Sequence, residues 1–266
     1  MSYSRSKSAV AENESEAKIL SLANVPVLIP AGGLAKRLLD QAKDTPKSLI
    51  DIGGEPFISH QLKLLKREGV TRVVLLLGHL GDKIKEFVDN TDDFQMEIIC
   101  VDDGEKALGT GGCVAKVLKE AGDEFAVMYG DSYLDISMAP VYQAFKDSAL
   151  PGMMTVLENN PHNNNQWEVS NVEFDRETGK IKAYDKKKPA DAMHHIDFGL
   201  SFFQKSAFDS FKNKKSFDLG LVFQNLAKAG KLAGYEVHRR FYDLNTPERL
   251  IETRAYLSQN KLWKFD

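Results

Sequence analysis

The chain has 266 residues, of which 42% are hydrophobic and 27% charged, as in globular proteins of one large domain or two small ones. Its formal net charge of -3 excludes the basic surplus of proteins that bind nucleic acid in bulk. No apolar stretch approaches the roughly 18 residues that span a bilayer, and the two cysteines, Cys100 and Cys113, lack a metal-type spacing. We therefore expect a cytoplasmic protein with no nucleic-acid or membrane partner.

The first 24 residues differ from the rest of the chain. They are polar, with six serines and balanced charges, and they lack the apolar core of a signal peptide. We expect a flexible tail over 1–24, with a short helix over 12–22 as the alternative. One domain is then expected over 25–266.

Strands and amphipathic helices alternate between residues 25 and 133. The apolar runs predict strands, and the helical periodicity predicts helices, over 27–29 (strand), 56–68 (helix), 72–77 (strand), 82–88 (helix), 96–101 (strand), 112–121 (helix) and 125–129 (strand). Repeated β-α-β units of this kind predict an α/β fold with a doubly wound, Rossmann-like sheet and helices on both faces.

After residue 150 the pattern changes to shorter strands. These are predicted over 152–158, 167–174, 180–184 and 196–203, with a hairpin turn at 177–179 and helices over 219–229 and 247–258. The asparagine-rich segment 159–166 is expected to be a mobile loop. We therefore expect a mixed sheet to which the second half adds a smaller β-rich lobe, with a returning strand as an option.

The most informative motif follows the first predicted strand. Gly32 and Gly33 precede Arg37 and, ten residues later, Lys47 behind a proline. Glycines let backbone N–H groups approach anionic oxygens, while arginine and lysine supply donors and charge for phosphate. The segment predicts a site for the phosphates of a nucleotide, although turn formation alone also explains the glycine pair. It matches neither the Walker pattern nor the dinucleotide fingerprint, so ATPase and hydride-transfer chemistry fit poorly.

Two carboxylates are candidate metal ligands. Asp131 follows an apolar strand, at the edge where open α/β sheets bind ligands, and a turn or helix cap is its alternative role. Asp243 lies just before Thr246 and Pro247, which form a helix start that does not need it. A carboxylate at this edge can hold a divalent cation such as Mg²⁺ on phosphate oxygens, and Asp243 could be a second ligand if the fold brings it to Asp131.

Two further segments are candidates for contacts with substrate. The glycines of 108–112 precede a predicted helix, and their backbone can press against a flat base; a plain loop is the alternative. The lysines 186–188 follow the predicted strand 180–184. Such a run commonly forms a solvated edge that discourages sheet aggregation, but one lysine among them can instead hold a phosphate.

In this order and spacing, the segments resemble the sugar-1-phosphate nucleotidyltransferases over roughly residues 25–258. The family's Gly-Gly-x-Gly-Thr-Arg-Leu and Pro-Lys are here Gly32-Gly33-Leu34-Ala35-Lys36-Arg37-Leu38 and Pro46-Lys47. Its base-contacting Leu-Gly-Thr-Gly-Gly is similar to 108–112, and its two magnesium aspartates to Asp131 and Asp243. Its Glu-Lys and Asn-Ala-Gly steps are similar to 185–186 and 197–199.

The resemblance implies roles for particular residues. Arg37 and Lys47 would be catalytic, and the nucleotide would contact Ala31, Gly32, Gly33, Leu34, Ala35, Lys36, Gly109, Thr110 and Gly111. The sugar and its phosphate would contact Asn171, Asp185, Lys186, Asp197 and Gly199, with Mg²⁺ on Asp131 and Asp243. The substrates would be an NTP and a sugar 1-phosphate. Residues 25–150 would form the nucleotide-binding part and 151–266 the sugar-binding part.

The chain also departs from the family pattern. Ala35 and Lys36 replace Gly-Thr, and Asn245 stands where glycine is usual, at a position expected to be left-handed, which asparagine tolerates. GTP with a mannose- or heptose-type sugar is favoured, with UTP and CTP close behind. Two alternatives stay open: a catalytically silent homologue that binds a nucleotide sugar and regulates a partner, and a cytidylyltransferase acting on a non-sugar phosphate or phosphonate. The oligomeric state is not readable from the sequence.

Overall fold

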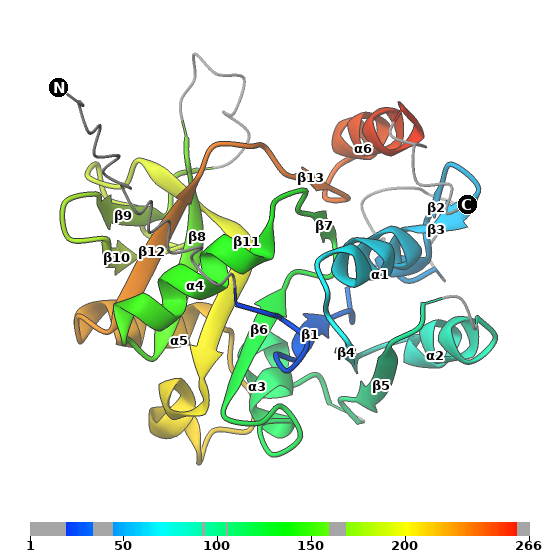
Figure 1. Ribbon diagram of the computed structural model, residues 1–266, viewed down its shortest axis with the longest axis horizontal. Coiled ribbons are helices and arrows are strands. Elements are labelled where there is room, and N and C mark those ends of the chain that lie inside the picture. Colours follow the sequence, from blue (N-terminus) through cyan, green and yellow to red (C-terminus); the bar gives the residue numbers. More distant parts are fainter. Residues whose placement is uncertain (1–19, 34–44, 92–93, 105, 160–168, 260–266) are drawn as a thin grey trace, which may run out of the picture.

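The computed structural model describes residues 20–33, 45–91, 94–104, 106–159 and 169–259 (Figure 1). Its centre is a nine-stranded mixed sheet in the order β5-β4-β1-β6-β11-β8-β12-β10-β9. The four strands of the first half are parallel where they pair: β5 (Glu97–Asp102), β4 (Arg72–Leu77), β1 (Val27–Pro30) and β6 (Glu124–Met128). The expected doubly wound α/β fold with a mixed sheet is thus confirmed.

The strands of the second half extend this same sheet. The long strand β11 (His195–Gln204) is antiparallel to β6 and to β8 (Gly152–Glu158), and β12 (Leu232–Val237) is parallel to β8. The hairpin of β10 (Lys180–Tyr184) and β9 (Val172–Asp175) follows. A pairing of Val172 with His195 links β9 back to β11, so the last five strands close on themselves.

Helices cover both faces of the sheet because successive strand residues point to opposite sides. In β1, for example, Val27 and Ile29 join one hydrophobic cluster and Leu28 joins the other, and all three are fully buried. The first face carries α1 (Phe57–Arg67), α2 (Gly81–Asp89) and α4 (Met138–Ser148). The second carries α3 (Gly109–Lys116), the short helical segment Lys205–Phe211 and α5 (Gly220–Lys228).

A third hydrophobic cluster joins segments far apart in the sequence. It packs α6 (Pro247–Gln259) against α1 and the two-stranded sheet of β2 (Asp51–Ile52) and β3 (Glu55–Pro56). A second small sheet pairs β7 (Ser132–Tyr133) with β13 (Tyr242–Asp243). These contacts carry the short helix Lys47–Leu49 and the loop after β13 toward the end of β6.

Most predicted elements are confirmed, but α4 and β12 were not predicted. The strand β12 contains Gly234, where an added Cβ would lie 2.6 Å from the ring of Phe174 and 2.7 Å from Ile181. A glycine interrupts the apolar pattern from which strands are predicted, yet here it is required by the neighbouring side chains. Helix α4 contains a proline, Pro140, but this lies in the first turn. N–H groups there have no partner within the helix, so the missing N–H of proline costs no helical hydrogen bond.

The boundaries of three other predictions change. Leu22, in the expected tail, is buried in the first hydrophobic cluster, so the folded domain begins before residue 25. The strand expected over 167–174 is shorter within the described residues, as β9. The helix expected over 112–121 begins at Gly109 and ends at Lys116. The expected tail residues 1–19 and most of the expected loop 159–166 lie outside the described residues.

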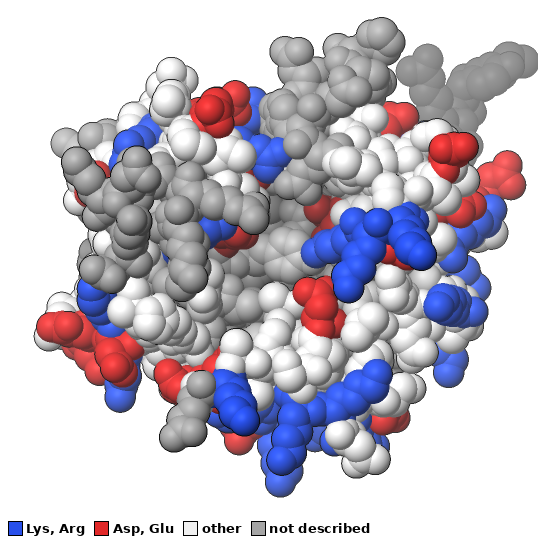
Figure 2. Space-filling view, turned by 180° about the vertical axis from the view of Figure 1, so that it is seen from behind, with Lys and Arg blue, Asp and Glu red and all other residues white. Residues whose placement is uncertain are grey.

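The surface holds both signs of charge. In Figure 2, lysine and arginine side chains are interspersed with aspartate and glutamate over the face seen from behind. Among the helices that the structure describes, none combines the length and the apolar character needed to cross a membrane.

Candidate active site

Two adjoining cavities lie at the carboxyl ends of the parallel strands. The first has a volume of about 550 Å³ and is lined by residues that follow β1, β4, β5 and β6. The second, of about 510 Å³, lies toward β11. Tyr129, Asp131 and Lys186 line both of them. Because open α/β sheets bind ligands at this edge, the pair of cavities is the candidate active site.

The glycine pair lines the end of the first cavity next to Lys47. Backbones pack closely there, since an added Cβ at Gly32 would lie 3.1 Å from the Cα of Gly78. The N–H of Lys47 donates to the carbonyl of Gly33 over 3.1 Å, which ties Lys47 to the glycine pair. Ala31, Gly32, Gly33 and Lys47 therefore line one cavity, and their contact with a nucleotide stays a prediction. Leu34, Ala35, Lys36 and Arg37 lie outside the described residues.

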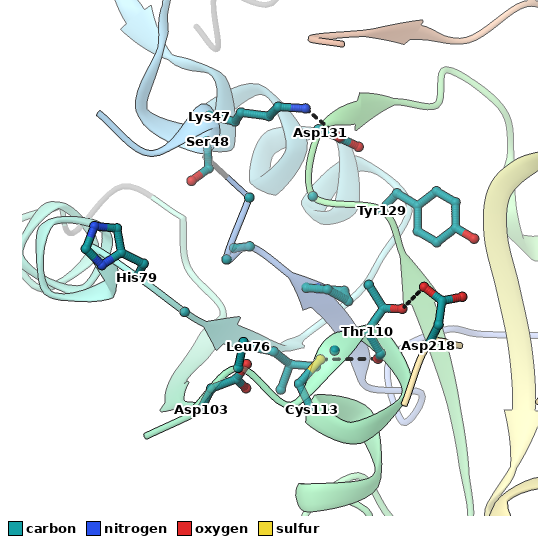
Figure 3. Close-up of a pocket in the computed structure, with 18 of the residues that line it drawn as sticks. Lys47, Ser48, Leu76, His79, Asp103, Thr110, Cys113, Tyr129, Asp131 and Asp218 are labelled. Atoms are coloured by element: carbon teal, nitrogen blue, oxygen red, sulfur yellow. Dashed lines mark hydrogen bonds and ion pairs between the residues drawn. The ribbon is translucent and has the colours of Figure 1, made fainter. Parts of the chain in front are cut away.

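The ammonium group of Lys47 lies between two acceptors. Its Nζ is 3.1 Å from Oδ2 of Asp131 and 2.8 Å from Oδ1 of Asn245. Lys47 and Asp131 point toward one another in Figure 3. Contrary to expectation, Asn245 does not have a positive φ. Its side chain instead enters the site.

The glycine-rich segment 108–112 lies against a loop from the second half of the chain. The N–H groups of Gly111 and Gly112 donate to the carbonyl of Phe217 over 2.9 and 3.1 Å, and Thr110 donates its hydroxyl to Asp218 over 3.2 Å. The carbonyl of Phe217, which lies outside the helix, thus accepts from N–H groups in the first turn of α3, and these have no partner within the helix. This explains why α3 begins at the glycines instead of after them.

Replacing Gly111 with alanine is expected to destabilise the protein. The new Cβ would lie 2.5 Å from ring atoms of Phe217, which is itself buried. The ring must move, and overpacking of this kind costs roughly 1–3 kcal/mol. We expect a lower midpoint in urea unfolding and weaker nucleotide binding, whereas Gly122→Ser, at an open positive-φ turn, is expected to leave nucleotide binding unchanged. Wild-type stability and binding in Gly111→Ala would contradict this packing role.

The opposite end of the first cavity is lined by Leu76, Asp103 and Cys113. Figure 3 shows these side chains away from Lys47 and Asp131. One carboxylate oxygen of Asp103 accepts from the N–H of Leu108 over 3.3 Å. Partial burial raises the pKa of the Asp103 carboxyl above its usual value. Burial also raises the pKa of the Cys113 thiol to about 12, so it stays protonated and is a poor nucleophile at neutral pH.

The second cavity is lined by polar groups held in a connected arrangement. The Tyr129 hydroxyl donates to Asp197 over 2.5 Å, and the N–H of Asp197 donates to Oδ1 of Asn171 over 3.1 Å. Burial raises the pKa of Tyr129 well above its usual value, so its hydroxyl stays protonated and remains a hydrogen-bond donor at neutral pH. The Nζ of Lys186 lies 5.4 Å from the Tyr129 ring centroid, a cation–π distance. Fixed acceptors and a cation of this kind suit a hydroxylated, phosphorylated ligand.

Several predicted site residues do not line either cavity. Asp185 is next to Lys186, but its Oδ1 accepts from the N–H groups of 187 and 188. Gly111 packs on Phe217, and Gly199 donates its N–H to Asp197 over 3.0 Å. Their direct contact with substrate stays a prediction, whereas Gly109, Thr110, Asn171, Lys186 and Asp197 line the cavities.

Asp243 is brought next to Asp131 through the backbone. In the small sheet of β13 and β7, Asp243 pairs with Ser132, and the N–H of Leu244 donates to the carbonyl of Asp131 over 3.0 Å. The side chain of Asp243 is only 1% exposed, and its two oxygens accept from Arg249 over 2.7 Å and from the N–H of Asn245 over 2.8 Å. Its predicted role as a metal ligand stays a prediction.

Sequence reasoning missed several lining residues. Asp103 follows the end of β5 just as Asp131 follows β6, so the rule that singled out Asp131 also applies to it. His79 and Tyr129 likewise follow parallel strands. No local signal pointed to Asp218, because its place beside Thr110 depends on the tertiary fold.

A family model described as "Nucleotidyl transferase" matches residues 26–260. A "Probable glucose-1-phosphate cytidylyltransferase" of Bacillus subtilis is 27% identical over 89% of this chain and 98% of its own length. A "Probable mannose-1-phosphate guanylyltransferase 1" of Oryza sativa subsp. japonica is 28% identical over 86% of this chain, which spans only 64% of that relative. Among solved structures, HddC from Yersinia pseudotuberculosis complexed with GMP-PN has a TM-score of 0.69 at 23% identity, covering 88% of this chain and 99% of that one. Likeness at that identity shows the fold alone.

Proposed function

The chain belongs to the nucleotidyl transferase family, and we propose that it forms a nucleotide sugar and pyrophosphate from an NTP and a sugar 1-phosphate. One observation carries this proposal: the two cavities meet at Asp131 and Lys186, and Lys47 reaches their junction. A nucleotide in the first cavity and a sugar phosphate in the second would bring the reacting phosphates together there. Such positioning is a large part of catalysis in phosphoryl-type transfers.

In the proposed reaction, an oxygen of the sugar 1-phosphate attacks the α-phosphorus of the NTP in line. A new P–O bond forms, the bond from the α-phosphorus to its bridging oxygen breaks, and pyrophosphate leaves with the electron pair. The attacking oxygen already carries charge, so no strong general base is required. Lys47 would stabilise charge at the α-phosphorus, Lys186 would hold the sugar phosphate, and Arg37 with the glycine loop would hold the β- and γ-phosphates.

We further propose that the reaction depends on magnesium. Asp131 fits such an ion, because its side chain is 32% exposed and lines both cavities. Among the described residues, no group of three or more His, Cys, Asp and Glu side chains gathers to hold a metal. Magnesium commonly takes one or two carboxylates and completes its shell with substrate phosphates and water. Asp243 can join Asp131 only if Arg249 releases its carboxylate.

Asp103 supports GTP as the nucleotide. The carboxylate lies at the far end of the first cavity from Lys47, where the base would sit beside Gly109. Guanine presents two adjacent N–H donors on its Watson–Crick edge, and a carboxylate accepts both. Uracil presents one N–H between two carbonyls, which a carboxylate repels. Partial burial raises the pKa of the Asp103 carboxyl although Leu108 donates to it, and the two donors of guanine would further stabilise the charged form.

Asp103→Asn is expected to reduce the preference of the enzyme for GTP over UTP. The amide presents an NH₂ where guanine also presents donors, so kcat/KM with GTP should fall roughly tenfold or more, by analogy with other bidentate base contacts. The ratio of kcat/KM for GTP to that for UTP measures the change. Asp123→Asn, at an exposed position outside both cavities, is the matched control. An unchanged ratio in Asp103→Asn would remove Asp103 from base recognition.

A mannose- or heptose-type sugar is proposed for the second cavity, whose acceptors Asn171 and Asp197 suit hydroxyl groups. The activity is tested by pyrophosphate release across nucleotides and sugar 1-phosphates. Release with a phosphonate or alcohol phosphate alone would instead favour the cytidylyltransferase alternative. Binding of nucleotide sugars without release would favour the silent homologue.

A further inference from the structure

The loop after β13 presents the Asn245 side chain in a defined position. The N–H of Asn245 donates to Oδ1 of Asp243 over 2.8 Å, and Arg249 holds the other oxygen of that carboxylate over 2.7 Å. Thr246 accepts from the N–H of Arg249 over 3.3 Å, at the start of α6. The Thr253 hydroxyl donates to the carbonyl of Asp243 over 2.8 Å. The loop is thus fixed to α6, which is itself packed on the third hydrophobic cluster.

Asn245 takes up one of the three donors of Lys47. The Nζ donates to its side-chain oxygen over 2.8 Å and to Asp131 over 3.1 Å, so one N–H is left for a phosphate oxygen. The Lys47 side chain is 17% exposed, so little water competes for these contacts. The two acceptors lie in the segments that follow β13 and β6, and both are distant in sequence from the lysine.

The two acceptors differ in one decisive respect. Asp131 is charged and lines both cavities, so any cation that neutralises substrate phosphates competes with Lys47 for its oxygens. The amide oxygen of Asn245 is neutral and is a weaker competitor for such a cation. It also leaves the positive charge of the lysine intact, whereas a second carboxylate would offset that charge. Asn245 would therefore keep Lys47 at the junction when such a cation occupies Asp131.

We infer that Asn245 is a positioning residue for Lys47, which it holds at the junction of the nucleotide and sugar-phosphate cavities through its side-chain oxygen. This inference rests on the proposed nucleotidyl transfer. It assigns a purpose to the asparagine that stands where glycine is usual in the sugar-1-phosphate nucleotidyltransferases. Glycine offers no side-chain acceptor, so the extra constraint on the lysine belongs to this chain.

The rival explanation is direct contact with the sugar, because Asn245 also lines the second cavity. The two roles move different kinetic constants. Loss of a positioning residue lowers kcat with little change in either KM, because Lys47 acts mainly in the transition state. Loss of a sugar contact raises KM for the sugar 1-phosphate and leaves KM for the NTP unchanged.

The experiment compares Asn245→Ala and Asn245→Asp with wild-type enzyme. We expect kcat of Asn245→Ala to fall about tenfold to a hundredfold, the range for a lost hydrogen bond to a charged group. Asn245→Asp keeps the acceptor for Lys47 and should recover part of that loss. Both variants should fold, because Asn245 has an ordinary negative φ and is only partly buried. Asn225→Ala is the matched control, since Asn225 bonds Ser210 on the surface of α5, over 3.4 Å.

A double-variant cycle with Lys47→Gln separates positioning from every indirect effect. If Asn245 acts through Lys47, adding Asn245→Ala to Lys47→Gln should change kcat less than twofold. Full additivity of the two losses, or a change confined to KM for the sugar 1-phosphate, would overturn the inference. These outcomes require an active wild-type enzyme, so absence of pyrophosphate release in wild type would refute the proposed function separately.

Discussion

Lys47→Ala is expected to lower kcat by more than about a hundredfold, because one preorganised donor at a developing charge is commonly worth about 3–4 kcal/mol. Lys47 reaches the junction of the two cavities and bonds Asp131 and Asn245 there. The attraction between its ammonium group and the α-phosphate would be strongest in the transition state, when the α-phosphorus gains its fifth oxygen. The loss should therefore appear in kcat and much less in KM for the NTP. Initial-rate kinetics of pyrophosphate release measure it.

The pair Lys212–Asp209 supplies a matched control for this variant. It is a lysine–aspartate pair at 3.0 Å, but both side chains are more than half exposed. Lys212→Ala should keep wild-type kcat and unfold at nearly the wild-type midpoint, as exposed pairs contribute little. If Lys47→Ala stays within a few-fold of wild type, Lys47 has no part in the chemistry.

Asp131→Asn is expected to be similarly damaging, with kcat lower by more than about a hundredfold. The amide keeps the shape of the side chain but removes the charge that would hold a divalent cation against the phosphates. We also expect the magnesium concentration for half-maximal rate to rise. A titration of rate against Mg²⁺ at saturating substrates measures both effects.

Asp209→Asn is the corresponding control, and it should leave the magnesium titration unchanged. Nucleotide binding in the absence of metal provides a second check on Asp131→Asn. It should persist, because the glycine loop and the base end of the first cavity do not include Asp131. An unchanged magnesium dependence with normal kcat would show that Asp131 does not hold the ion.

The sheet was predictable where apolar runs alternate with periodic helices. The strands 72–77 and 125–129 and the helix 56–68 are clear in the sequence because one physical pattern dominates each. The strand order was not readable, since pairing of β11 with both β6 and β8 depends on contacts distant in sequence. Gly234 concealed β12 because a tertiary requirement overrode the local strand pattern.

The site was predictable to a similar extent. Motif spacing indicated Lys47 and Asp131, and the structure brings their side chains within 3.1 Å. It did not indicate that Asn245 would complete the pair, because that contact joins residues 198 positions apart. The buried ion pair of Asp243 with Arg249 was also not predicted, because the sequence pattern singled out Asp243 only as a candidate metal ligand and gave Arg249 no role.

The most direct test of the central claim is pyrophosphate release with Mg²⁺ across GTP, UTP, CTP, ATP and dTTP and a panel of hexose and heptose 1-phosphates. The account predicts release from a specific pair, with GTP and a mannose- or heptose-type 1-phosphate first among them. It also predicts loss of that release in Lys47→Ala. No release from any pair, while nucleotide sugars still raise the melting temperature, would contradict the account and indicate a binding protein without catalysis.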